Sequence, residues 1–96
     1  MATSSIAQRW RLDGQVAFVT GGGGGIGRAI ALGLAEAGAD IAIFEIVPER
    51  AAETAERVRE LGRRALPLPG DAMDMEAIRT AIVETDSHFG RIDISR

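Results

Sequence analysis

A run of five glycines, Gly21 to Gly25, followed by Ile26 and Gly27, is the segment best suited to binding chemistry. Because such a run has no Cβ atoms, its backbone can approach a phosphate, and the first amides of a following helix point at the anion. The spacing fits both G-x-G-x-x-G and G-x-x-x-G-x-G. It does not fit the nucleoside-triphosphate P-loop, which needs Lys and then Ser or Thr where this chain has Arg28 and Ala29. A flexible linker is the alternative, but the apolar segments on both sides favour phosphate binding.

A second candidate side chain is Glu45, which ends an apolar segment 18 residues after Gly27. A dinucleotide-binding fold places an acid at this point, where its carboxylate accepts hydrogen bonds from the adenosine ribose. A solvated acid at a strand end is the alternative. A 2′-phosphate about 4 Å away would be repelled by about 4 kcal/mol per unit charge at an effective dielectric constant of about 20. The sequence therefore predicts NAD rather than NADP, with Arg50 as a nearby cation that could offset the repulsion.

Absent residue types limit the chemistry further. The chain has no Cys, Tyr or Lys, and all 11 basic residues are Arg. It therefore has no thiolate nucleophile, no cysteine-ligated metal, no Schiff-base lysine and no phenol for acid–base work. The single histidine, His88, is interpreted as an exposed structural residue. We predict no catalytic residue and no metal site within this chain.

The elements that must position these residues alternate along the sequence. Apolar runs bounded by glycines or charges predict strands at residues 16–20, 41–45 and 65–69 and a strand stub at 92–94, and helical spacing predicts three intervening helices at 26–37, 48–61 and 75–89. Strands separated by helices of this length imply right-handed crossovers and a parallel sheet. Pro67 and Pro69 place the third strand at a sheet edge, because proline cannot donate to a neighbouring strand.

Two helical stripes are predicted to be core. Ile26, Ile30 and Leu34 recur every four residues in the first helix. The third helix follows Asp74, a good N-cap, and its predicted stripe consists of Met75, Ile78, Ile82 and Phe89.

Length and composition indicate one small globular unit. The chain has 96 residues, 46% hydrophobic and 26% charged, with a net charge of −3. The dispersed arginines do not suggest nucleic-acid binding. No apolar run is long enough to span a membrane, and the first residues lack the apolar core of a secretory signal. We expect a flexible lead-in at residues 1–10, a partial dinucleotide-binding domain at 11–96 and a cytoplasmic location.

Several landmarks resemble the short-chain dehydrogenase/reductase family. Residues 20–27 match its T-G-x-x-x-G-I-G fingerprint. Four other segments match in the right order, at residues 12–16, 38–45, 70–71 and 89–94. The resemblance covers nearly the whole chain and implies a truncated α/β fold of Rossmann type, with about three strands, three helices and the stub.

This resemblance implies how the glycine loop meets the cofactor. Gly21 makes the tight turn, Gly25 permits close approach of the pyrophosphate, and Gly27 lets the helix pack on the strand. The backbone of Gly24 and of Ile26 lies along the dinucleotide. The implied function is the NAD-binding part of an oxidoreductase that transfers hydride to or from alcohols and carbonyls.

The resemblance also implies three contacts at the adenosine end. Glu45 holds the ribose, while Asp71 and the backbone of Ala72 meet the adenine ring. A turn or helix-entry aspartate is the alternative for Asp71.

The sequence departs from the family after Ile94. The family continues this strand into Asn-Asn-Ala-Gly and carries Ser, Tyr and Lys further on, whereas this chain has Ser95 and Arg96. Three interpretations stay open: an inactive cofactor-binding part of an enzyme, a non-enzymatic nucleotide-binding module that needs a partner, or a truncated product without function. With the fourth strand only a stub, residues 16–20 are expected to form an exposed apolar edge, with self-association as its consequence.

Overall fold

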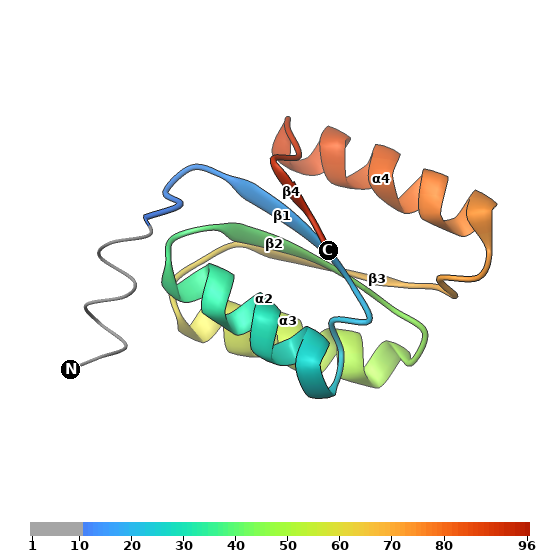
Figure 1. Cartoon of the computed structure of the whole chain (residues 1–96), viewed down its shortest axis with the longest axis horizontal. Helices are drawn as coiled ribbons and strands as arrows, with labels where there is room; N and C mark the ends of the chain where they lie inside the picture. The colour runs from blue at the N-terminus through green and yellow to red at the C-terminus, as the bar shows by residue number, and fades with distance from the viewer. Residues whose placement is uncertain (1–10) are drawn as a thin grey trace.

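A computed structural model describes residues 11–96 of the chain, and the lead-in predicted for residues 1–10 lies outside this part. Strands and helices alternate as the sequence predicts (Figure 1). The elements are β1 (Val16–Thr20), α2 (Gly25–Glu36), β2 (Asp40–Glu45), α3 (Pro48–Glu60), β3 (Ala65–Pro69), α4 (Met75–Phe89) and β4 (Ile94–Ser95).

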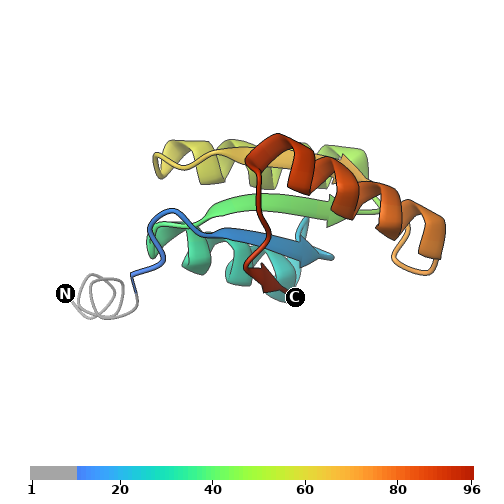
Figure 2. The same cartoon turned by 90° about the horizontal axis from the view of Figure 1, so that it is seen from above.

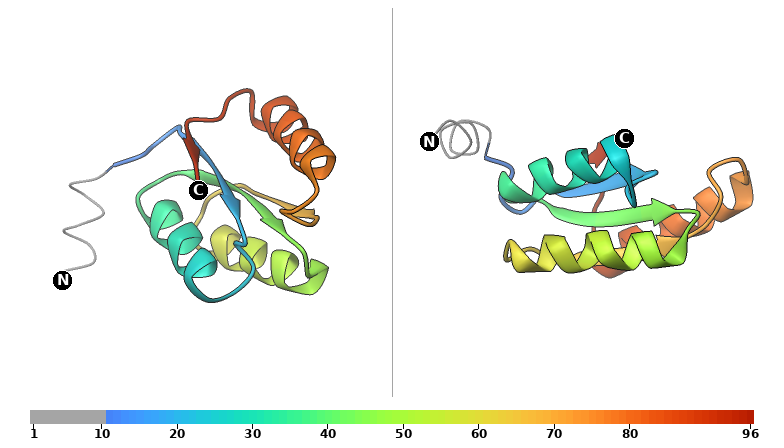
Figure 3. Two further views of the ribbon diagram at one scale, coloured as in Figure 1. Left: turned by 45° about the vertical axis from the view of Figure 1, so that its right-hand side comes forward. Right: turned by 90° about the horizontal axis from the view of Figure 1, so that it is seen from below.

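The strands form one parallel sheet in the order β3-β2-β1-β4. Helices α2 and α3 lie on one face of this sheet and α4 lies on the other (Figures 1 and 2). Viewed from below, α2 and α3 run side by side along β1 and β2 (Figure 3). This three-layer arrangement is the predicted Rossmann-type fold, and it places the carboxyl ends of β1, β2 and β3 at the same edge of the sheet.

Alternate residues of each strand enter two separate cores. Ala17 and Val19 of β1 pack with α2 and α3, whereas Phe18 packs with α4. Phe18 also stacks on Phe44 of β2, with ring centroids 5.9 Å apart. Because helices cover both faces, β1 and β2 are apolar at nearly every position, as parallel strands usually are.

Strand β1 is not the exposed edge that the sequence predicts. Ala17 pairs with Ile94 of β4, the Thr20 amide donates to the Arg96 carbonyl over 2.6 Å, and the Arg96 amide donates to the Phe18 carbonyl over 2.8 Å. The short β4 is therefore enough to occupy the backbone groups of β1. The sheet edges within residues 11–96 are β4 and β3, and the edge position predicted for β3 from its prolines is confirmed.

The predicted helical stripes are only partly buried. Ile26 is 81% exposed, because the first turn of α2 leads away from the glycine run and the helix packs its alanine face, Ala31 and Ala35, on the sheet. In α4, Ile78 and Phe89 pack on the second core, but Met75 and Ile82 are exposed. The core prediction was therefore wrong for Ile26, Met75 and Ile82.

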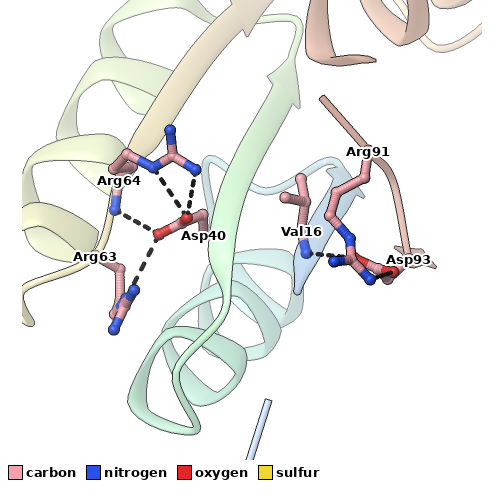
Figure 4. A network of polar contacts seen from close by, with 6 residues as sticks. All are labelled: Val16, Asp40, Arg63, Arg64, Arg91 and Asp93. Carbon is pink, nitrogen blue, oxygen red and sulfur yellow. Dashed lines mark hydrogen bonds and ion pairs between the residues drawn. The ribbon is translucent and has the colours of Figure 1, made fainter. Parts of the chain in front are cut away.

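Two clusters of hydrogen bonds and ion pairs, here called joints, hold the amino ends of the central strands β1 and β2 (Figure 4). Asp40, at the start of β2, accepts from the backbone amide of Arg64 over 2.9 Å and from its Nε over 3.0 Å, and Arg63 lies 3.5 Å from its Oδ1. Burial disfavours the charged carboxylate. The hydrogen bonds from Arg64 and the charges of Arg64 and Arg63 outweigh this effect and hold the pKa of Asp40 below its usual value.

The second joint ties β1 to the segment before β4. Asp93 accepts from the amide of Val16 over 2.9 Å, and Arg91 binds the same carboxylate with two nitrogens, at 2.8 and 2.7 Å. The hydrogen bonds from Arg91 and from Val16 hold the pKa of Asp93 below its usual value. Because this joint lies at the amino end of the strands, away from the glycine loop at their carboxyl ends, Asp93 has a structural role.

Candidate functional site

The glycine loop joins the carboxyl end of β1 to α2 at residues 21–24. Gly21 and Gly25 have φ angles of +66° and +53°, in the left-handed region. This region is open to glycine and costly for most other residues. The tight turn predicted at Gly21 is present, and a second one stands at Gly25, where α2 begins.

Three further glycines leave room for neighbouring atoms. A Cβ on Gly27 would overlap the carbonyl oxygen of Gly21, and a Cβ on Gly22 would lie 2.8 Å from Ile43 in β2. A Cβ on Gly23 would overlap the side chain of Glu45. Gly24 differs from these three, because the nearest atoms to its Cβ position belong to Arg50, at 3.8 Å. The loop therefore lies directly on the ends of the strands.

The amino end of α2 is suited to an anion. Its N-cap is Gly24, no side chain accepts a hydrogen bond from its first amides, and its first turn contains no acidic residue. The helix dipole and these amides therefore present partial positive charge at the loop. By contrast, α4 is capped by Asp74, which accepts from the amides of Glu76 and Ala77.

Glu45 lies at the end of β2 with its carboxylate against the glycine loop. Its side chain is buried; Oε1 accepts from the amide of Gly23 over 3.0 Å, and Oε2 accepts from the amide of Val47 over 3.1 Å. The solvated acid considered as an alternative is therefore wrong. Each carboxylate oxygen has two lone pairs, so acceptor capacity remains after these two bonds.

Asp71 follows β3 and makes a local turn. Its Oδ1 accepts from the amide of Met73 over 2.9 Å, and both Asp71 and Ala72 are exposed. The preceding residue, Gly70, donates its amide to the Glu45 carbonyl over 2.9 Å. The fold thus places residues 70–72 beside the end of β2, and the turn considered as an alternative for Asp71 is present.

With this geometry in view, comparison with known proteins identifies the family. The family model described as short chain dehydrogenase matches residues 15–94. The chain is a member of the short-chain dehydrogenase family. It spans about a third of the length of the curated relatives it matches.

Relatives and solved structures of short-chain dehydrogenases agree with this assignment. An uncharacterized oxidoreductase of Bacillus subtilis is 42% identical over 85 residues, which cover 88% of this chain and 29% of the relative. Versicolorin reductase 1 of Aspergillus parasiticus is 44% identical over 90 residues, or 93% and 34% of the two chains. The structure of carveol dehydrogenase from Mycobacterium avium, in complex with NAD, aligns with a TM-score of 0.84 at 37% identity and covers 88% of this chain and 35% of that one.

Two arginines of this short-chain dehydrogenase chain lie at the loop but were not predicted as site residues. Arg28, in α2, donates to the carbonyl of Gly23 over 2.8 Å. Arg50, in α3, lies against Gly23 and Gly24, whereas the sequence indicated it only as a nearby cation that could offset the repulsion of a 2′-phosphate. The contact of Arg28 ties the first turn of α2 back to the loop, and residue spacing alone does not reveal this contact.

Other candidate features lie apart from the loop. His88 is exposed on α4 and meets the ring of Phe89 edge-on. Within residues 11–96 no cluster of His, Asp and Glu could hold a metal, and no helix could cross a membrane. A groove of about 440 Å³ between β3 and α4, lined by Pro67 and Thr80 among others, contains no residue of the glycine loop.

Proposed function

We propose that this chain is the NAD-binding part of a short-chain oxidoreductase. The observation that carries the proposal is the contact between Glu45 and the glycine loop at the carboxyl end of the sheet. It brings an acceptor for ribose hydroxyls next to a loop and a helix end that can accept a pyrophosphate. The cytoplasmic location stays a prediction from the sequence.

The residues present fit a dinucleotide. A Cβ would fill the space at Gly22, Gly23 and Gly27, so the loop backbone stands close to the strand ends, while the Cβ position of Gly24 faces open space apart from Arg50. We assign the pyrophosphate to the backbone of Gly21, Gly24, Gly25, Ile26 and Gly27, the ribose to Glu45, and the adenine to Asp71 and the backbone of Ala72.

Preference for NAD over NADP is part of the proposal. Glu45 is buried at the end of β2 and accepts two backbone hydrogen bonds. A second negative charge beside this carboxylate would be repelled, whereas a 2′-hydroxyl could donate to it. Arg50 lies over the same loop and reduces this discrimination without reversing it.

We further propose that the 96-residue chain binds NAD without turnover. When bound, NAD supplies a nicotinamide ring that accepts or gives a hydride. The chain's own residues bind and orient the dinucleotide, but they include no Tyr or Lys to hold or move the substrate proton. In a longer protein, residues outside this chain would supply that acid–base chemistry and the substrate site.

Titration calorimetry of the purified chain tests the proposal. We expect saturable binding of NAD with one site per chain, competition by AMP because the adenosine half contacts Glu45, and at least tenfold weaker binding of NADP. Absence of saturable NAD binding would overturn the proposed function. Oxidation of an alcohol with NAD, or reduction of a carbonyl with NADH, by the pure chain would overturn the proposed lack of turnover and leave the proposed NAD binding standing.

A nucleotide-binding module that assembles with another chain is the second candidate. The observation in its favour is β4, a two-residue strand with no further strand on its outer side within the described residues. An unpaired edge can pair with another chain, including a second copy. Light scattering over a concentration series should then show a mass that rises with concentration. A monomeric mass at all concentrations would count against this candidate.

A further inference from the structure

The peptide groups of Gly23 are held from two sides by side chains of opposite charge. Its amide donates to Oε1 of Glu45 over 3.0 Å, and its carbonyl accepts from a guanidinium nitrogen of Arg28 over 2.8 Å. Both contacts involve an ion, and such hydrogen bonds are stronger than neutral ones. The middle of the glycine run is therefore fixed before any ligand arrives.

The other two guanidinium nitrogens of Arg28 contact residues of α3. Its Nε donates to Oγ1 of Thr54 over 2.9 Å, and its Nη1 pairs with Glu53 over 2.6 Å. Thr54 is fully buried, whereas the Arg28 side chain is 19% exposed and that of Glu53 is 58% exposed. Because a guanidinium is planar and rigid, anchoring Nε on a buried hydroxyl also fixes the nitrogen that meets Gly23.

We infer that Arg28 is a positioning residue for dinucleotide binding, an inference that rests on the proposed function. Glycine has more backbone freedom to lose than any other residue, so a run of five would be costly to order upon binding. Arg28 lowers that cost because it connects the loop to the packed helix α3. Binding to a loop that is already ordered retains more of the interaction free energy.

Three variants of the purified chain test the role of Arg28. R28M keeps the aliphatic stem and removes every donor, R28K keeps the charge and one donor group, and the control E53Q leaves the bond to Gly23 in place. The readouts are the Kd for NAD, measured well below each variant's Tm, and the ¹H–¹⁵N nuclear Overhauser effect of the Gly23 amide without ligand.

We expect the three variants to weaken NAD binding to different extents. R28M should bind NAD about tenfold more weakly and show a lower Overhauser effect at Gly23, because it loses a charged hydrogen bond. R28K should fall between R28M and the wild type, and E53Q should stay within about twofold of the wild type, as exposed ion pairs contribute little. If R28M fails to fold, the comparison of R28K with the wild type tests the same role of Arg28.

The possible outcomes distinguish the positioning role of Arg28 from the proposed function of the chain in NAD binding. A wild-type Kd together with a wild-type Overhauser effect at Gly23 in R28M would overturn the positioning role and leave the proposed function standing. If the wild-type chain itself does not bind NAD, the proposed function fails and the positioning role fails with it.

Discussion

Glu45 and Gly23 lie 22 residues apart in sequence, yet the buried carboxylate of Glu45 accepts a hydrogen bond from the Gly23 amide over 3.0 Å. Parallel strands bring this about, because β1 and β2 pair in register from Val16 and Asp40 to Thr20 and Phe44 and end together. The acid that we assign to the ribose is thus also a support of the loop that we assign to the pyrophosphate.

The dual role of Glu45 leads to a prediction for cofactor choice. In E45Q the amide oxygen can still accept from Gly23, but the negative charge is lost. We expect weaker NAD binding, and a ratio of NADP to NAD affinity at least tenfold higher, since the repulsion of a 2′-phosphate disappears. Titration calorimetry with both cofactors measures this ratio.

Arg50 provides the control for E45Q. Its side chain lies over Gly24, where it could meet a 2′-phosphate. The double variant E45Q/R50A should therefore lose much of the gain in NADP affinity. An unchanged cofactor ratio in E45Q would contradict the placement of the ribose at Glu45.

Two glycines of the same helix are expected to respond in opposite ways to alanine. A Cβ on Gly27 would overlap the Gly21 carbonyl, so G27A should destabilise the chain by about 1–3 kcal/mol and abolish NAD binding. A Cβ on Gly33 meets no atom within 4 Å, so G33A should stabilise α2 by about 0.5–1 kcal/mol and leave binding intact.

Urea unfolding and NAD titration of G27A and G33A check this pair. Equal tolerance of both substitutions would mean that the loop does not pack on the start of α2 as described.

The lowered pKa of Asp40 makes the free energy of unfolding depend on pH. Its pKa is lower in the folded chain than in the unfolded one, so the unfolded state binds more protons as the pH falls. The contribution of Asp40 is complete above the unfolded pKa of about 4 and is lost as the pH falls through the lower folded value. Urea unfolding between about pH 6 and pH 3 should show this loss, and D40N should show a flatter profile and lower stability near neutral pH.

The control for D40N is D86N, which changes an exposed carboxylate of α4 that forms no ion pair within the described residues. D86N should keep the acid slope of the wild type. If D40N keeps that slope too, the joint between Asp40 and Arg64 does not govern acid stability.

Local patterns in the sequence were sufficient for the order of the elements and for the position of the loop. The glycine run and the prolines of β3 act through the backbone geometry of their own residues, so their places in the fold follow from residue type. Which side of a helix is buried depends on the tertiary neighbours. For this reason Ile26 and Met75, which fit a helical stripe, are exposed.

Two other contacts could not be predicted in the same way. The bond from Arg28 to Gly23 depends on how the loop turns back toward α2 and α3, and the pairing of β4 with β1 depends on the joint between Asp93 and Val16. Neither has a signal in residue spacing. The first adds a residue to the candidate site, and the second makes β1 an inner strand.

The most direct test of the account is an NAD titration of the ¹⁵N-labelled chain followed by amide NMR. The account predicts saturable shifts at residues 21–27, at Glu45 and at residues 71–72, with little change along the groove between β3 and α4. Spectra that stay unchanged at saturating NAD, or shifts confined to that groove, would contradict the assignment of the glycine loop as the dinucleotide site.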